Sequence, residues 1–267
     1  MFTVMDLTIK ALLQTYGLMQ VTFFNSLFAL IALIIWIFPN ADRIKTSRPK
    51  LHFFRAFAIV CADLLAFYAF GKAEVAEVYT LLLTMPIFTA IFAILFSVEK
   101  FNAFRILCSF LGFGGALLVL VPEYSHFNIA LFAALGCAMI EALCFLAISH
   151  LRHQESPESY VFYSLLLLCL ITGSLMMIDF KEPEIKDVGL SVFGGISYAL
   201  GTVFVTTAFI HGVPSKVSSM QYSQLVWGML LAFIIWNEIP DTYAILGGII
   251  VMIAGLALIL QKAKFNQ

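Results

Sequence analysis

The segment LMQVTFFNSLFALIALIIWIF, residues 18–38, decides the fold class, because it contains no charged side chain from one end to the other. A helix needs about 20 mostly apolar residues to cross the hydrocarbon core of a bilayer. This segment meets that length, and Gly17 precedes it while Pro39-Asn40 follows it. We therefore expect a transmembrane helix here.

The same pattern recurs along the rest of the chain. Charged residues, proline and glycine separate the apolar runs into predicted spans at residues 18–38, 51–71, 75–97, 102–121, 127–150, 158–178, 187–210, 215–236 and 242–261. One further apolar segment, residues 1–13, is too short to cross alone at about 1.5 Å per residue. It is expected either to be a shortened first helix or to continue a longer one upstream. The connecting loops are very short, so consecutive helices should be antiparallel neighbours, and no soluble domain fits between them.

The composition agrees with an integral membrane protein that consists of α-helices alone. Hydrophobic residues make up 62% of the chain and charged residues 12%, whereas a soluble domain is about half apolar and about a quarter charged. With so few cations and a net charge of -1, the chain has no basic surface for nucleic acid. The cysteines lie inside apolar runs without a CxxC pair, so we expect no disulfide, no zinc site and no cofactor.

The basic residues predict the orientation in the membrane. Lys and Arg in short loops favour the cytoplasm. The loop after the first long span holds Arg43, Lys45, Arg48 and Lys50. If that loop is cytoplasmic, the same side receives most of the other cations, namely Lys100, Arg105, Arg152, Lys216, Lys262 and Lys264. We therefore expect a multi-pass membrane protein with both termini in the cytoplasm.

The two halves of the chain resemble each other. When Glu99 is placed on Glu238, the same offset places Ala69-Phe70 on Ala208-Phe209. Five helices in each half put the two glutamates on opposite sides of the membrane, which predicts an inverted repeat with halves at 1–121 and 122–267. Inverted repeats are characteristic of secondary transporters, whose substrate lies near the membrane midplane between the repeats. Both glutamates are expected to cap the helix that follows them, where the helix dipole favours an anion.

An ordered set of residues along this frame resembles the EamA-like family of drug/metabolite transporters. The set consists of Arg55, the run AEVAEVYT at residues 73–80, Pro86, Glu99 and the glycine-rich segments 112–116 and 247–255. The resemblance covers essentially the whole chain. It implies ten helices in two inverted five-helix bundles that carry small organic solutes across a bacterial inner membrane by alternating access.

The chain departs from that family's pattern at three places. Asn25, in the run Phe23-Phe24-Asn25-Ser26, stands where many members have the arginine of a Phe-Phe-Arg-Ser run. Leu225 replaces the proline that symmetry with Pro86 would predict. The first helix is short. The first and third of these departures concern the substrate rather than the fold.

Two carboxylates near the centres of predicted spans are the leading site candidates. A carboxylate at membrane depth costs at least about 2.5 kcal/mol, so Asp63 and Glu141 should each face a cavity or a partner. Both are predicted to handle substrate or protons; the alternative is a neutral, hydrogen-bonded acid that joins two helices. Asp6 and Lys10 lie four positions apart on one helix face, where they can pair with each other or serve in coupling.

Polar and aromatic residues of two later spans extend the predicted substrate site. Gln221 and Gln224, with Ser218 and Gly228, form one helical stripe beside Trp227, which lines either a cavity or a helix–helix contact. Tyr198 and Thr202 form a similar stripe on the preceding span. Tyr68 is the candidate aromatic contact from the first half, since planar solutes benefit from stacking surfaces.

These features favour a secondary transporter for a small organic solute, acting as a monomer or homodimer in the lipid bilayer, by uptake or by export, and driven by proton coupling or exchange. A passive channel or a structural membrane subunit is the alternative. An intramembrane enzyme is disfavoured, because the sequence lacks GxSxG, HExxH and paired-aspartate motifs. An ATP-driven pump is disfavoured because no loop has room for a nucleotide-binding domain.

Overall fold

The computed structural model describes residues 1–98, 103–120, 128–151 and 155–260, and within these ranges the chain is helical, without β-strands. Among the described residues, six helical segments are long and apolar enough to cross a membrane. They are Leu18–Ile44, Pro49–Phe70, Val75–Leu95, Ile129–His150, Pro157–Asp179 and Ile185–His211. The predicted all-helical membrane architecture is confirmed at this level.

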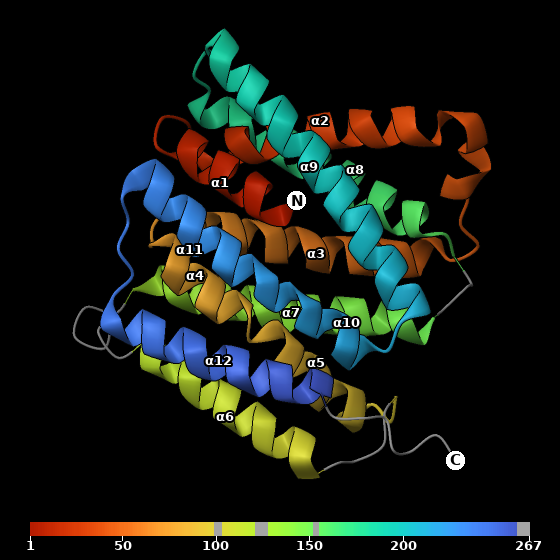
Figure 1. Ribbon diagram of the computed structural model, residues 1–267. Coiled ribbons are helices and arrows are strands. Elements are labelled where there is room, and N and C mark those ends of the chain that lie inside the picture. The colour runs from red at the N-terminus through yellow and green to blue at the C-terminus, as the bar shows by residue number, and fades with distance from the viewer. Residues whose placement is uncertain (99–102, 121–127, 152–154, 261–267) are drawn as a thin grey trace. The chain divides into compact units, whose positions relative to one another are not determined.

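The chain forms two compact units, and each unit combines segments from both halves of the sequence (Figure 1). Unit 1 contains Met1–Lys72 and Leu151–His211, and unit 2 contains Ala73–His150 and Gly212–Gln267. The chain therefore passes from one unit to the other after Lys72, after His150 and after His211. The compact units differ from the sequence halves 1–121 and 122–267, because helices of both halves pack together within each unit.

Unit 1 is a bundle of long helices around α2. Its elements are α1 (Phe2–Leu13), α2 (Leu18–Ile37), η1 (Phe38–Ile44), α3 (Pro49–Phe70), α8 (Pro157–Met176), η3 (Met177–Asp179) and α9 (Ile185–His211). Helix α2 packs against α8 and α9, α3 packs against α8, and α1 packs against α9. Close approach of α9 to α2 depends on Gly195, because a Cβ atom there would lie 2.8 Å from the Asn25 carbonyl oxygen.

Unit 2 contains shorter helices, two pairs of which continue one another. Its elements are α4 (Val75–Leu82), α5 (Met85–Leu95), α6 (Ala103–Leu120), α7 (Ile129–His150), α10 (Pro214–Ser219), η4 (Met220–Tyr222), α11 (Ser223–Trp236) and α12 (Thr242–Leu260). Helices α6 and α12 run side by side (Figure 1). Their contact needs Gly115, where a Cβ atom would lie 2.9 Å from the Gly247 carbonyl oxygen.

Two predicted spans are interrupted rather than continuous. The first break, at Leu83-Thr84, precedes Pro86, which has no N–H to donate and crowds the preceding turn. The Thr84 hydroxyl donates to the Leu81 carbonyl at 2.6 Å and so satisfies an acceptor at the break. The second break is the 3₁₀ turn Met220–Tyr222, where the sequence has no proline. The offset that matches Glu99 to Glu238 places Leu83-Thr84 on Tyr222-Ser223, at the end of the second break.

The cap predicted for Glu238 is on a different helix from the expected one. Its carboxylate accepts a hydrogen bond from the Val75 backbone N–H at 3.1 Å, at the start of α4 rather than of α12. Asn237 precedes it with φ of 56°, a left-handed conformation that asparagine tolerates and that turns the chain at the end of α11. The corresponding prediction for Glu99 lies outside the described residues.

The Gly228→Ala substitution tests how closely α11 packs on α4. A methyl group at this position overlaps the Tyr79 ring, and that ring is 0% exposed, so it has no space into which to turn. Overpacking of this kind costs about 1–3 kcal/mol. We expect a lower melting temperature for the purified variant in detergent.

The matched control is Gly114→Ala in α6 of the same unit, where a Cβ atom meets nothing within 4 Å. This control should melt with the wild type. If the two variants melted at the same temperature, the close contact between Gly228 and Tyr79 would be contradicted.

Candidate functional site

The structure brings together two of the predicted site residues, Asp63 of α3 and Tyr198 of α9. The Tyr198 hydroxyl donates to the Asp63 carboxylate at 2.6 Å. Tyr198 is 5% exposed, and the Phe67 ring packs edge-on against it with ring centroids 6.4 Å apart. A short hydrogen bond to a carboxylate is stronger than one between neutral groups. The pair therefore joins α3 to α9 within unit 1.

Two other predicted site residues lie on the same helices as this pair, but only Thr202 lies next to it. Thr202 lies one turn beyond Tyr198, and its hydroxyl donates to the Tyr198 carbonyl at 2.8 Å. Tyr68 is half-buried and lies five positions after Asp63, which is about 140° around the helix axis. Tyr68 therefore does not share the helix face that carries Asp63.

The inner face of α3 carries a second polar group, Arg55, which the sequence indicated only as part of the family resemblance. Arg55 is 7% exposed, and its guanidinium lies 5.0 Å over the Tyr160 ring of α8. It donates to the Tyr160 carbonyl and to the Ser164 hydroxyl, each at 3.2 Å. This arrangement gives a buried cation several partners, as membrane depth requires. The spacing of Tyr160 and Ser164, one helical turn apart, is the sequence signal that could have indicated a polar seam.

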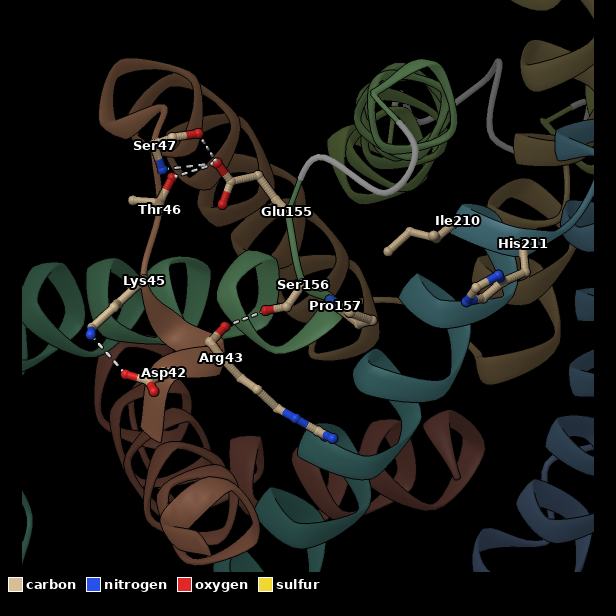
Figure 2. Close-up of a pocket in the computed structure, with 10 residues that line it drawn as sticks. All are labelled: Asp42, Arg43, Lys45, Thr46, Ser47, Glu155, Ser156, Pro157, Ile210 and His211. Carbon is tan, nitrogen blue, oxygen red and sulfur yellow. Dashed lines mark hydrogen bonds and ion pairs between the residues drawn. The ribbon is translucent and has the colours of Figure 1, made fainter. Parts of the chain in front are cut away.

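Glu155 organises a polar cluster at the end of unit 1, formed by the α2–α3 loop and the start of α8 (Figure 2). Its carboxylate accepts hydrogen bonds from the Thr46 hydroxyl at 3.0 Å and from the Ser47 backbone N–H and hydroxyl at 3.1 Å each. The His52 Nε2 atom lies 3.5 Å from the other carboxylate oxygen, and both side chains are almost fully buried. We define the loop cluster as six residues: Arg43, Thr46, Ser47, His52, Glu155 and Glu158.

Arg43 and Glu158 complete the loop cluster. Their side chains form an ion pair at 2.7 Å. The Ser156 hydroxyl donates to the Arg43 carbonyl, as Figure 2 shows. These contacts fix the α2–α3 loop onto the start of α8. The sequence analysis did not predict this cluster, because its members lie far apart along the chain.

The acidity of Glu155 reflects these contacts. Burial raises the pKa of its carboxyl, but the hydrogen bonds from Thr46 and Ser47 and the nearby His52 outweigh burial, so the pKa lies below its ordinary value of 4.5. The carboxylate is therefore ionised at neutral pH.

A pocket of about 720 Å³ opens beside the loop cluster (Figure 2). Its walls come from the α2–α3 loop, from Glu155, Ser156 and Pro157, and from Ile210-His211 at the end of α9. The chain enters unit 1 at Leu151, shortly before the second of these segments, and leaves unit 1 after His211, at the end of the third. Acidic and basic side chains line this pocket, and none of the predicted substrate-binding residues is among the lining residues.

In unit 2, two residues of the predicted glutamine stripe are buried in helix contacts, and the two glutamines are half-buried. Ser218 is 0% exposed, and its hydroxyl donates to the Ser215 carbonyl at 3.3 Å, while Gly228 packs on Tyr79. Gln221, in η4, and Gln224, in α11, are half-buried. The ends of the stripe therefore make helix contacts, while Gln221 lies within the helix break and Gln224 in the first turn of the helix after it.

The remaining candidates occupy three separate helices. Glu141 is half-buried in α7, and Trp227 of α11 is 57% exposed. Asp6 and Lys10 are 6% and 8% exposed, one turn apart on α1 of unit 1. Among the described residues, no group of three or more His, Cys, Asp or Glu side chains could hold a metal ion.

Membrane-length helices, acidic and basic side chains at membrane depth, and interrupted helices together define a polytopic membrane transporter. The model of the EamA-like transporter family matches residues 1–121 and 128–261. The chain belongs to this family, and the resemblance predicted from the sequence is confirmed.

Several relatives of the chain are named as transporters or exporters. A pseudopaline exporter of Pseudomonas aeruginosa is 28% identical over 96% of this chain and 91% of its own. An S-adenosylmethionine uptake transporter of Rickettsia bellii is 25% identical over 92% of this chain and 84% of its own. A riboflavin transporter of Vibrio cholerae is 27% identical over 79% of this chain and 72% of its own. The chain is accordingly a membrane transporter and not an enzyme.

A solved crystal structure shares the fold. It matches with a TM-score of 0.73 over 100% of this chain and 99% of its own, at 13% identity. At this identity the likeness concerns the fold alone.

The Glu155→Ala substitution tests the loop cluster. It removes the acceptor for Thr46 and Ser47 and leaves buried His52 without its carboxylate. Because a lost partner leaves buried donors unsatisfied, we expect the α2–α3 loop to open and trypsin to cleave faster after Arg43 and Lys45. The control Glu184→Ala, whose exposed side chain pairs only with exposed Lys186, should be cleaved like the wild type. Equal cleavage of all three proteins would contradict the role of Glu155.

The lowered pKa of Glu155 predicts how this contribution depends on pH. A carboxyl whose pKa is lowered on folding stabilises the fold above its ordinary pKa and loses that contribution as pH falls through the lowered value. The melting temperature of the wild type should therefore exceed that of Glu155→Gln at pH 7, and the difference should shrink below pH 4.5. A difference that grew with acidification would contradict the assignment.

Proposed function

We propose that this chain is a secondary active transporter that moves a small organic metabolite across the bacterial inner membrane by alternating access, coupled to protons. The observation that carries the proposal is the Asp63–Tyr198 hydrogen bond inside membrane-spanning helices of unit 1. In this proposal both termini are cytoplasmic, as the distribution of basic residues predicts.

The chemistry of Asp63 supports a coupling role. An ionised carboxylate has about four acceptor positions, and the hydroxyl of Tyr198 occupies one of them. The remaining positions are open to a proton or to a cationic group of a solute. If the carboxyl is protonated in one state of the cycle and ionised in the other, proton binding shifts the balance between the two states. Glu141, Asp6 and Lys10 are the other coupling candidates.

The helix breaks support the inverted repeat. Transporters with inverted repeats bind their substrates near interrupted helices that occupy corresponding positions in the two halves. Leu83-Thr84 and Met220–Tyr222 occupy such positions. We therefore propose ten helices as two inverted five-helix repeats, residues 1–121 and 122–267.

The proposed substrate contacts lie in both units. In unit 1, Asp63 and Tyr198 supply a charged and a hydrogen-bonding group, and Thr202 and Tyr68 remain proposed contacts. In unit 2, Gln221 lies in the second break and Gln224 in the first turn of the helix after it, and Glu141 and Trp227 remain proposed contacts.

The test is solute uptake into proteoliposomes with and without a pH gradient. S-adenosylmethionine and riboflavin form the starting panel, because relatives are named for them. We expect saturable uptake that the gradient accelerates in the wild type. The Asp63→Asn variant should lose about tenfold or more of the gradient-driven rate, since hydrogen bonds to charged groups contribute about 1.5–3 kcal/mol.

Tyr198→Phe is the matched variant, because it keeps the ring that packs against Phe67 and removes only the hydroxyl. It should reduce the gradient-driven rate without lowering the amount of folded protein. Uptake that ignored both the gradient and Asp63→Asn would rule out proton coupling at this carboxylate, and flux that never saturated would point to a channel.

A further inference from the structure

The outer face of α3 combines a cation with three exposed aromatic rings. Lys50, Phe53, Phe54 and Phe57 follow the spacing i, i+3, i+4 and i+7, which places them on one side of the helix. The phenylalanines are 57%, 71% and 52% exposed, and Lys50 is also exposed. The opposite face of α3 holds the buried residues, and on the outer face Phe53 packs edge-on against Phe54 with ring centroids 5.9 Å apart.

Two cations at this end of α3 form no ion pair with a described carboxylate. In the α2–α3 loop, Arg43 is paired with Glu158, and Lys45 is paired with Asp42. Within the described part of the chain, the side chains of Arg48 and Lys50 have no carboxylate partner. Both residues are exposed, and they lie directly before the phenylalanines. The loop therefore presents uncompensated positive charge next to an apolar surface.

We propose that Arg48, Lys50, Phe53, Phe54 and Phe57 form a binding surface for an anionic phospholipid, which we call the α3 lipid surface. Arg48 and Lys50 contact the phosphate of the headgroup, and the acyl chains lie along the phenylalanine rings. The proposal rests on the proposed function only in that α3 spans the membrane and begins at its surface.

Charge and apolarity together favour a lipid over a soluble anion. Basic residues at a membrane surface attract anionic lipids, by about fivefold in affinity for each charge. Lys50 can extend its alkyl stem along the rings while its ammonium stays at the headgroup level. A free phosphate would meet only two exposed cations, whose attraction is screened by salt. The rings contribute only when acyl chains cover them.

The position of the surface links it to the candidate site. Helix α3 carries Asp63 on the face opposite the exposed rings. A lipid held at the start of this helix therefore acts on the element that positions the coupling carboxylate.

The test compares the full chain in nanodiscs of phosphatidylcholine with nanodiscs that contain an increasing fraction of phosphatidylglycerol. We expect the melting temperature of the wild type to rise with phosphatidylglycerol and native mass spectrometry to detect retained lipid. The double variant Arg48→Gln/Lys50→Gln should bind this lipid about twenty-five-fold more weakly, at about fivefold for each charge. Its melting temperature in pure phosphatidylcholine should equal that of the wild type, which verifies its fold.

The matched control is Lys72→Gln/Lys186→Gln, which removes two exposed cations elsewhere in unit 1. It should keep the response of the wild type. A second variant, Phe53→Ser/Phe54→Ser, should also weaken lipid retention. An equal response from the Arg48/Lys50 variant and the control would overturn the proposal, and so would equal stabilisation by soluble glycerol phosphate.

These readouts do not involve transport. Failure of lipid binding with intact proton-coupled uptake would overturn only the α3 lipid surface, and failure of uptake with intact lipid binding would overturn only the proposed function.

Discussion

A polar group inside a bilayer has no water to bind, and this constraint governs the rest of the structure. Threonine and serine hydroxyls satisfy it locally by donating to carbonyls of the preceding turn, as Thr22, Thr80 and Thr172 do. Charged groups need partners from other helices, and α3 shows both solutions at once. Arg55 is held by α8, and Asp63 is held by Tyr198 of α9. Because each partner comes from a distant part of the sequence, these bonds also determine which helices form unit 1.

The two faces of α3 divide the chemistry of unit 1. The inner face carries His52, Arg55 and Asp63 against neighbouring helices, and the outer face carries Lys50 and the exposed phenylalanines. A cation that has protein partners becomes part of the packing, as Arg55 does. A cation without a protein partner is available to the headgroup of a lipid. The same physical requirement thus accounts for both the candidate site and the α3 lipid surface.

The positions of the long helices could be predicted from the sequence, because charged residues, proline and glycine mark their ends. The predicted span 51–71 corresponds to Pro49–Phe70, and 242–261 corresponds to Thr242–Leu260. The breaks were harder to predict. Pro86 marks the first break, but at Met220–Tyr222 the sequence has no proline, and the polar stripe was taken as part of a continuous helix.

Partners across the chain could not be predicted, because spacing gives information only within one helix. Asp63 and Tyr198 were each predicted as site residues, yet their hydrogen bond joins positions 135 apart. Glu155 and Thr46 are 109 positions apart, and neither was recognised as important. Glu238 was predicted to cap a helix, but the helix that it caps depends on the turn at Asn237.

The central claim is that Asp63 carries a proton during the transport cycle. The most direct measurement follows the internal pH of proteoliposomes with a trapped dye while a transported solute enters in the absence of an imposed gradient. The account predicts that solute entry moves protons in the wild type and that Asp63→Asn abolishes this proton movement. Solute entry without any change of internal pH in the wild type would contradict the account.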